Sequence, residues 1–180
     1  KKNIKKTKYL LNKFDMNIKS FQSIFFKINM KYKSNKKNIN HLTNHFKKVV
    51  NLAHELNVKN LSIGTCPTRF YNKNNEIFFN LNLNLFKKLS SIASKKKITI
   101  SLEPVSRKYG NFFLNNIDEA FNFINKLGKN NIKLLLDTGN CKTEKLDYKK
   151  KFKQYRKFIN HVQLSNPKMD LINVKEIRNE

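Results

Sequence analysis

Hydrophobic positions along the chain alternate between helical spacing and short strand-like runs. The clearest helical stretch is residues 40–58, where apolar residues recur every three or four positions on one stripe, namely Leu42, Phe46, Val49, Val50, Ala53 and Leu56. Short apolar runs with strand character occupy residues 18–26, 60–67, 98–104, 132–137 and 158–165. Further helices are expected before residue 18, near 83–97, over 116–128 and near 145–157.

The segment 116–128 carries start and stop signals for a helix at both ends. Asn116 is a good N-cap residue, and Glu119 stands three positions later, where a capping box needs an acid or amide. Gly128 follows the last apolar position and is the usual residue to end a helix. We therefore expect this helix to begin after Asn116 and to end at Gly128.

Helices and strands are thus expected to alternate strictly, with strands roughly 30–40 residues apart. Such alternation predicts a parallel sheet with right-handed crossovers. A partial (β/α)8 barrel and an open doubly wound sheet both fit, but no glycine-rich phosphate loop follows any strand. The sequence favours residues 1–180 as one incomplete barrel domain of about five parallel strands with outer helices.

Polar residues stand at or just past the ends of the expected strands: Gln22, Arg69, Glu103, Asp137 and Gln163. The carboxyl ends of barrel strands form the active-site face. Glu103, Asp137 and either His161 or Gln163 close three successive strands, and neighbouring strands lie about 4.8 Å apart. Oxygen donors with one amide or imidazole suit Mg²⁺, Mn²⁺ or Co²⁺.

Asp137 is the most informative of these residues, because it follows the apolar run 132–136 with no basic neighbour. An ionised carboxylate is almost never buried without a partner, and a divalent cation would supply one. A second interpretation stays open, since Asp137-Thr138-Gly139-Asn140 is also good chemistry for a turn or a helix N-cap.

The net charge of +26 suggests nucleic acid as a partner at first sight. The type of basic residue argues otherwise, because 34 of the 38 basic residues are Lys, scattered along the chain among 29 Asn. Proteins that read DNA bases depend on Arg forks. We therefore attribute the charge to compositional bias and expect no specific nucleic-acid partner.

The cysteines, the apolar stretches and the N-terminus indicate the compartment in which the protein is expected. Cys66 and Cys141 form no disulfide framework or CxxC pair, which favours reduced thiols in the cytoplasm. No apolar stretch approaches the ~20 residues that a membrane span needs. The basic N-terminus is a poor signal peptide, because it lacks a long apolar core.

Several segments, in the right order, resemble one known family. They are "SFQSIFF" (20–26), "HFKKVVNLAHELNVKNLSIGTCPTR" (45–69), "LEP" (102–104), "LLLDTGN" (134–140) and "INHVQLSNP" (159–167). Together they are similar to strands three to seven of the xylose isomerase-like TIM barrels, a superfamily of sugar phosphate isomerases and epimerases. The resemblance extends from about residue 8 to 170.

The resemblance implies a metal site and assigns it residue by residue. Glu103 and Asp137 match the metal-binding acids of the fifth and sixth strands, and Gln163 replaces the second His of an H-x-H on the seventh. The fourth ligand, a Glu on the eighth strand, has no counterpart, because the chain ends before that strand. Glu103 would also shuttle a proton, and Arg69, Asn140 and His161 would contact the substrate.

Three functions follow from these observations as alternatives. The first is metal-assisted isomerisation or epimerisation of a small sugar or hydroxy-carbonyl compound. The second is an AP endonuclease similar to endonuclease IV, which the net positive charge of the chain favours. Endonuclease IV holds a cluster of three zinc ions with many His ligands, and the scarcity of His in this chain therefore disfavours this function. The third is not an enzyme but a decayed or truncated product, or a half-barrel that acts only through a partner, because the sheet would have open edges and exposed apolar faces. A homo-oligomer also stays open.

Overall fold

The computed structural model describes residues 2–25, 28, 36–64, 76–168 and 170–172. The elements in chain order are α1 (Lys2–Lys13), β1 (Ser20–Phe21), α2 (Lys36–Glu55), β2 (Asn60–Ile63), α3 (Glu76–Ser94), β3 (Thr99–Leu102), a 3-10 turn η2 (Arg107–Tyr109), α4 (Ile117–Leu127), β4 (Ile132–Asp137), α5 (Thr138–Thr143), α6 (Tyr148–Tyr155) and β5 (Ile159–Gln163). No helix among these described residues is long and apolar enough to cross a membrane.

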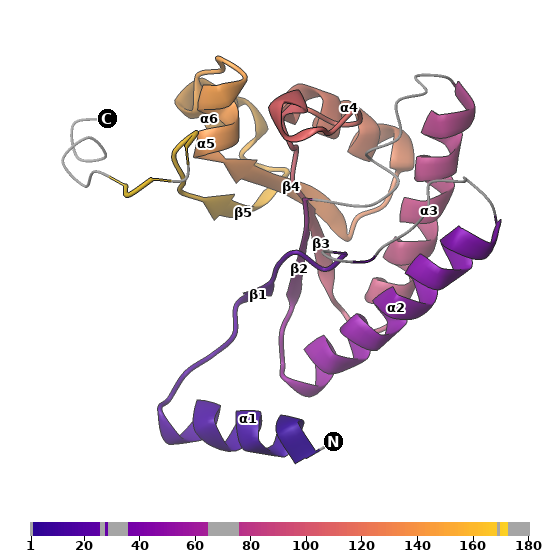
Figure 1. Ribbon diagram of the computed structural model, residues 1–180, viewed down its shortest axis with the longest axis vertical. Helices are drawn as coiled ribbons and strands as arrows, with labels where there is room; N and C mark the ends of the chain where they lie inside the picture. Colours follow the sequence, from indigo (N-terminus) through magenta and orange to yellow (C-terminus); the bar gives the residue numbers. More distant parts are fainter. Residues whose placement is uncertain (1, 26–27, 29–35, 65–75, 169, 173–180) are drawn as a thin grey trace.

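The strands form one parallel five-stranded sheet in the order β1-β2-β3-β4-β5. Each strand therefore pairs with the next one in the sequence, as in an arc of a barrel, and α2, α3 and α4 lie along the outside of the sheet (Figure 1). A doubly wound sheet would not keep this sequential order. The expected partial barrel is confirmed, and the open doubly wound alternative is wrong.

The hydrophobic core lies between the outer face of the sheet and the helices. Alternate strand residues such as Leu61, Ile63, Ile100 and Leu102 are fully buried there. The stripe of α2 predicted from the sequence packs into the same core, with Phe46 fully buried. The period of two along each strand leaves the intervening residues on the opposite face, which we call the inner face.

Polar side chains occupy much of the inner face, where a barrel usually has bulky aliphatic residues. Asn60 Nδ2 donates to Ser20 Oγ at 2.9 Å, and Ser101 Oγ donates to Asn60 Oδ1 at 2.6 Å. Asn160, on β5, donates from Nδ2 to Asn60 Oδ1 at 3.0 Å and to Ser101 Oγ at 3.1 Å. A side chain on β5 can touch one on β2 only if the sheet is strongly curved.

A β-bulge places Asn160 in this network. Leu134 pairs with Ile159, but the next residue, Leu135, pairs with His161, so Asn160 is an extra residue in β5. A bulge increases the local bend and twist of a strand. The sequence pattern gave no sign of it.

The capping signals of α4 are confirmed. Asn116 Oδ1 accepts from the Glu119 backbone N–H at 3.0 Å, and Gly128 ends the helix with a φ of 63°. Glu119 Oε2 accepts from the backbone N–H of Asn115, one residue before the N-cap. Other boundaries differ: α2 begins at Lys36 and α3 at Glu76, both earlier than expected, and the run 18–26 yields only the two-residue strand β1.

Candidate functional site

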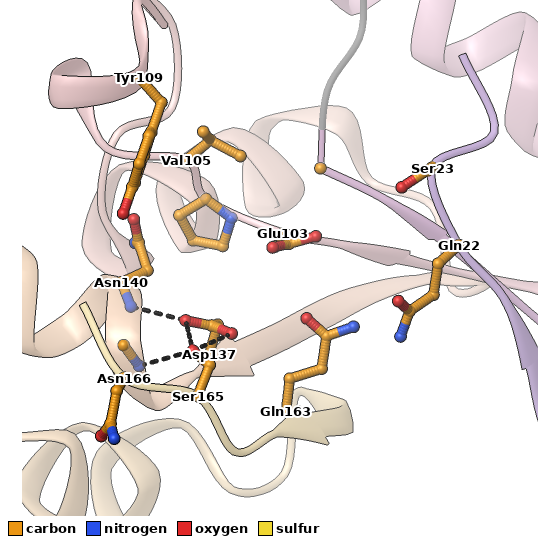
Figure 2. Close-up of a pocket in the computed structure, with 13 residues that line it drawn as sticks. Gln22, Ser23, Glu103, Val105, Tyr109, Asp137, Asn140, Gln163, Ser165 and Asn166 are labelled. Atoms are coloured by element: carbon orange, nitrogen blue, oxygen red, sulfur yellow. Dashed lines mark hydrogen bonds between the residues drawn. The ribbon is translucent and has the colours of Figure 1, made fainter. Parts of the chain in front are cut away.

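A pocket of about 440 Å³ opens at the carboxyl ends of the strands, on the inner face of the sheet (Figure 2). The described residues that line it are Gln22, Ser23, Gly64, Glu103, Pro104, Val105, Tyr109, Asp137, Gly139, Asn140, Gln163, Ser165 and Asn166. The pocket therefore brings together all three residues expected to hold a metal: Glu103, Asp137 and Gln163. Its position matches the active-site face of a barrel.

Glu103 directly follows β3, and its backbone N–H donates to Ile63 O at 3.0 Å, which continues the pairing with β2. Its carboxylate lies against the backbone of Gly64. A Cβ atom at position 64 would stand 2.2 Å from Glu103 Oε2, so a side chain larger than hydrogen would displace the carboxylate. Sequence reasoning missed Gly64, although a glycine straight after a strand in a chain with four glycines is a usable signal.

Asp137 ends β4 and is also the N-cap of α5. Its Oδ1 accepts from the Asn140 backbone N–H at 2.6 Å, and Ser165 Oγ lies 2.9 Å from both Oδ1 and Oδ2. The helix-cap interpretation is therefore confirmed. A serine hydroxyl has one proton to donate and a carboxylate has about four acceptor positions. The cap thus leaves Asp137 with acceptor capacity for a cation.

Gln163 ends β5 and pairs in register with Asp137. It is half-buried, and its carboxamide turns into the space that the carboxylates of Glu103 and Asp137 face (Figure 2). Paired residues of parallel strands point to the same face of the sheet. The register therefore explains why Gln163 and Asp137 meet at this pocket.

The three residues expected to contact substrate have different positions. Asn140 lines the pocket, but its Oδ1 accepts from the Ser106 backbone N–H at 2.8 Å and its Nδ2 donates to Asn115 O at 3.3 Å. Its carboxamide thus ties α5 to the loop between β3 and α4. His161 is half-buried on β5 and is absent from the described lining of the pocket. Arg69 lies outside the described residues.

Two further contacts that the sequence did not reveal build the wall of the pocket. The Tyr109 hydroxyl donates to Pro167 O at 2.8 Å, which joins η2 to the segment after β5. A Cβ atom on Gly139 would stand 2.3 Å from Ser165 Oγ, so the first turn of α5 packs directly on that segment. Both contacts span distant parts of the sequence, and no local pattern marks them.

The donor set fits a hard divalent cation. Two carboxylates and one amide oxygen are available from Glu103, Asp137 and Gln163, and oxygen ligands suit Mg²⁺ or Mn²⁺. Among the described residues, no group of three or more His, Cys, Asp and Glu side chains could hold a metal. A metal site built on Glu103 and Asp137 would therefore depend on Gln163 for its third donor.

Cys141, on α5 beside the pocket, is buried and not in a disulfide. Burial, helped by the nearby charge of Asp137, raises the pKa of its thiol to about 11. The thiol is therefore protonated at neutral pH, and only a thiolate is an effective nucleophile or metal ligand. Cys141 is a packing residue of the core.

Comparisons with solved structures agree with this architecture. The 3-keto-D-glucoside 4-epimerase YcjR from E. coli has a TM-score of 0.79 at 12% identity, over 99% of this chain and 72% of its own. An AP endonuclease, family 2, from Brucella melitensis has a TM-score of 0.74 at 12% identity, over 94% of this chain and 69% of its own. The IOLI protein, whose structure holds a zinc atom, has a TM-score of 0.69 at 18% identity, over 86% of this chain and 54% of its own. At such identities the likeness concerns the fold.

No curated protein matches the chain by sequence. The family model described as xylose isomerase-like TIM barrel, however, matches residues 1–174, which is nearly the whole chain. The sequential parallel strands and the pocket at their carboxyl ends agree with that match. The chain belongs to the family of xylose isomerase-like TIM barrels.

Proposed function

We propose that the complete protein is a metal-assisted isomerase or epimerase acting on a small sugar or hydroxy-carbonyl compound. The observation that carries the proposal is the convergence of Glu103, Asp137 and Gln163 on one pocket at the carboxyl ends of β3, β4 and β5. The likeness to a sugar epimerase supports it at the level of the fold. The chain spans between about half and three quarters of these structures, so the activity is proposed for the whole protein.

Each residue has a distinct role in the proposed reaction. Asp137 and Gln163 would hold the cation, and the contact from Ser165 would fix the orientation of the Asp137 carboxylate. Glu103 would bind the same ion and accept the proton from the carbon beside the substrate carbonyl. When bound, the cation supplies polarisation of the carbonyl and the adjacent hydroxyl. The proton returns to carbon in the product, so no electron donor or acceptor is consumed.

An AP endonuclease is the alternative, because the net charge of +26 and the likeness to the Brucella structure favour it. The arrangement of His residues disfavours it. The chain has four His, and three of them, His41, His45 and His54, lie on α2 outside the sheet. Only His161 lies on a strand, and it is absent from the described lining of the pocket. A cluster of several zinc ions needs several nitrogen ligands.

The test is an assay of the complete protein with Mn²⁺ on free ketohexoses and aldohexoses. We follow product formation and the incorporation of solvent deuterium at the carbon beside the carbonyl. Glu103→Gln keeps the shape of the side chain but removes its basicity, and should lower both rates by about 10²–10⁴-fold. Glu55→Gln, at an exposed position on α2, is the matched control and should retain both.

Two results would contradict the proposal. Full turnover by Glu103→Gln would exclude the carboxylate as the base. Cleavage of an abasic-site duplex at physiological salt, without any sugar turnover, would favour the endonuclease instead.

A further inference from the structure

Basic residues gather in the five turns that lead into the strands of the sheet. These turns cover residues 14–19, 56–59, 95–98, 128–131 and 156–158, and each carries at least one Lys or Arg. Eight of their 21 residues are basic, against 38 of 180 in the whole chain, and Asp15 is their one acid. The eight basic residues are Lys19, Lys59, Lys95, Lys96, Lys97, Lys129, Arg156 and Lys157. Compositional bias explains the number of lysines in the chain, but it does not explain this concentration in the turns.

The five turns lie together at one edge of the sheet, because its strands are parallel. We call them the amino-end face, after the amino ends of the strands that they precede. The pocket opens at the opposite edge, at the carboxyl ends. Since the sheet curves as an arc of a barrel, the turns spread over an area and not along a line (Figure 1). The amino-end face therefore presents a broad basic surface.

The charges of the amino-end face are available to a partner. Seven of its eight basic side chains are exposed, and the eighth, Lys96, is half-buried. Within the part of the chain that the structure describes, none of the eight takes part in an ion pair, whereas Lys151 of α6 pairs with Asp118 of α4. Like charges that stand close together repel one another, and an anionic partner would remove that repulsion.

Exposed apolar side chains stand in the same turns. Phe14 and Met16, in the turn before β1, are 60% and 62% exposed, and Phe158, in the turn before β5, is 37% exposed. Single apolar residues on a surface need no explanation. Large apolar residues set among lysines, however, are the combination with which proteins bind the surface of an anionic membrane.

Helix α1 extends the amino-end face with the same combination. Its side chains and those of the turn before β2 line one shared cavity, so the helix lies beside that turn. Lys6, Leu10 and Lys13 are spaced by four and three residues and are all exposed, so they share an outward side of α1. The backbone N–H of Phe14 donates to Leu10 O at 3.1 Å, which places Phe14 in the same helical turn.

We propose that the amino-end face, together with α1, binds the surface of a membrane that contains anionic lipids. The Lys side chains would contact lipid phosphates, and Leu10, Phe14, Met16 and Phe158 would enter the headgroup region. The contact is with the surface and does not span the bilayer. It does not depend on the proposed function, because the pocket lies at the opposite edge of the sheet and stays open to solution.

Nucleic acid is the other polyanion that a basic surface can hold. The side chains of the amino-end face favour lipid over nucleic acid. Leu10 and Met16 are aliphatic and cannot stack on bases as aromatic residues do. Of the eight basic residues, Arg156 alone has the forked guanidinium that nucleic-acid recognition favours.

The experiment measures how the complete protein partitions onto sedimented lipid vesicles. Vesicles of phosphatidylcholine alone are compared with vesicles that also contain about 30% phosphatidylserine. At about 0.1 M NaCl, we expect a partition coefficient about 100-fold higher on the anionic vesicles. At about 0.5 M NaCl it should fall at least about tenfold, because salt screens the lysines. Equal partitioning onto both kinds of vesicle would overturn the inference.

Two triple variants of equal net charge test whether the position of the lysines matters. Lys59→Glu/Lys97→Glu/Lys129→Glu reverses three charges of the amino-end face, and Lys47→Glu/Lys87→Glu/Lys88→Glu reverses three exposed charges on α2 and α3. The first should lower partitioning onto anionic vesicles at least about 100-fold, and the second about threefold or less. Equal losses would show that net charge alone drives binding, and would overturn the inference.

A second pair of variants tests the apolar contribution. Phe14→Ser/Met16→Ser removes two exposed apolar side chains of the amino-end face and should lower partitioning about tenfold or more. Phe112→Ser/Phe152→Ser removes two that are 45% exposed elsewhere and should leave it unchanged. Equal partitioning of the two double variants would overturn the assignment to a membrane.

Nucleic acid is tested by fluorescence anisotropy with labelled single-stranded RNA and duplex DNA of about 20 nucleotides. Weak binding that the two triple variants lower equally supports the inference. Tight binding that only the amino-end variant abolishes, without partitioning onto vesicles, would assign the face to nucleic acid and overturn it.

Discussion

The hydroxyl of Ser165 lies 2.9 Å from both carboxylate oxygens of Asp137, across 28 residues of sequence. Ser165 stands just after β5, whereas Asp137 ends β4 and caps α5. The contact joins two neighbouring strand ends at the pocket and fixes the plane of the carboxylate. Ser165 also accepts from the Gly139 backbone N–H at 3.1 Å, so one side chain organises the whole turn.

We expect Ser165→Ala to weaken both the fold and the proposed metal site. The variant removes hydrogen bonds to a charged group, which should lower the free energy of unfolding by about 1.5–3 kcal/mol. It should also lower Mn²⁺ affinity by about 10–100-fold, because the carboxylate loses its orientation. Denaturant unfolding and calorimetric Mn²⁺ titration measure the two effects. Ser91→Ala, which removes an exposed side-chain bond to Lys87 O, is the control and should change neither affinity nor activity.

Gly64 should tolerate no side chain while Glu103 is present. In Gly64→Ala the new Cβ atom would meet Glu103 Oε2, so the carboxylate must move away from its position in the pocket. We expect lower thermal stability and at least about tenfold weaker Mn²⁺ binding. The double variant Gly64→Ala/Glu103→Ala should recover the stability, because the clashing atoms are gone. Additive losses in the double-mutant cycle would show that the contact is not the cause.

Acid should weaken the junction between α4 and α6. Asp118 accepts from Lys151 Nζ at 2.8 and 2.7 Å and from the hydroxyl of Tyr155. Burial alone would raise the pKa of Asp118, but these hydrogen bonds and the charge of Lys151 hold it below its usual value of 3.8. Its stabilising effect is therefore present above pH 3.8 and lost as the pH falls through the lowered value. The free energy of unfolding, measured between about pH 2 and 7, should lose this acid dependence in the variant Asp118→Asn.

Tyr155, which donates to Asp118 from α6, gives an independent check of the contribution of this junction to stability. The pKa of Tyr155 is raised to about 12, because burial and the Asp118 carboxylate both disfavour the phenolate. Stability from the protonated Tyr155 should be present below its ordinary value near 10 and lost as the pH rises toward 12. Tyr155→Phe should lose this alkaline component. An unchanged pH profile in both variants would mean that the cluster contributes nothing to stability.

Local patterns predicted much of this architecture, because the forces behind it are local. The stripe of α2 follows directly from burial on one face of the helix, and the apolar residues Leu61 and Ile63 of β2 pack into the same core. The caps of α4 were readable because Asn116, Glu119 and Gly128 lie within one helix. The sequential strand order followed from strict alternation.

The rest of the site depends on contacts that no local pattern records. The contact of Ser165 with Asp137, the reach of Tyr109 to Pro167 and the packing of Glu103 on Gly64 each join separate segments. The bulge at Asn160 was missed for a related reason, and the short helix α5 was left open as one of two interpretations. "DTGN" fits a turn and a helix start equally well, and packing against the segment after β5 decides between them.

The cap role of Asp137 permits a sharp test of its role as a metal ligand. Asn caps a helix about as well as Asp does, so Asp137→Asn should keep α5 and the fold intact. The same change removes the charge that a divalent cation needs. The variant thus separates the two roles, whereas Asp137→Ala would remove both.

The most direct measurement of the central claim is thermal unfolding of the complete protein with and without Mn²⁺, for wild type and Asp137→Asn. Metal at 100 times its dissociation constant should stabilise the wild type by about 2.7 kcal/mol. Without metal, the variant should unfold somewhat below the wild-type temperature, because a neutral amide accepts more weakly from Ser165 than a carboxylate does. Mn²⁺ should shift that temperature little. A variant that keeps the full Mn²⁺ shift would show that Asp137 is only a helix cap, and the proposed site would be wrong.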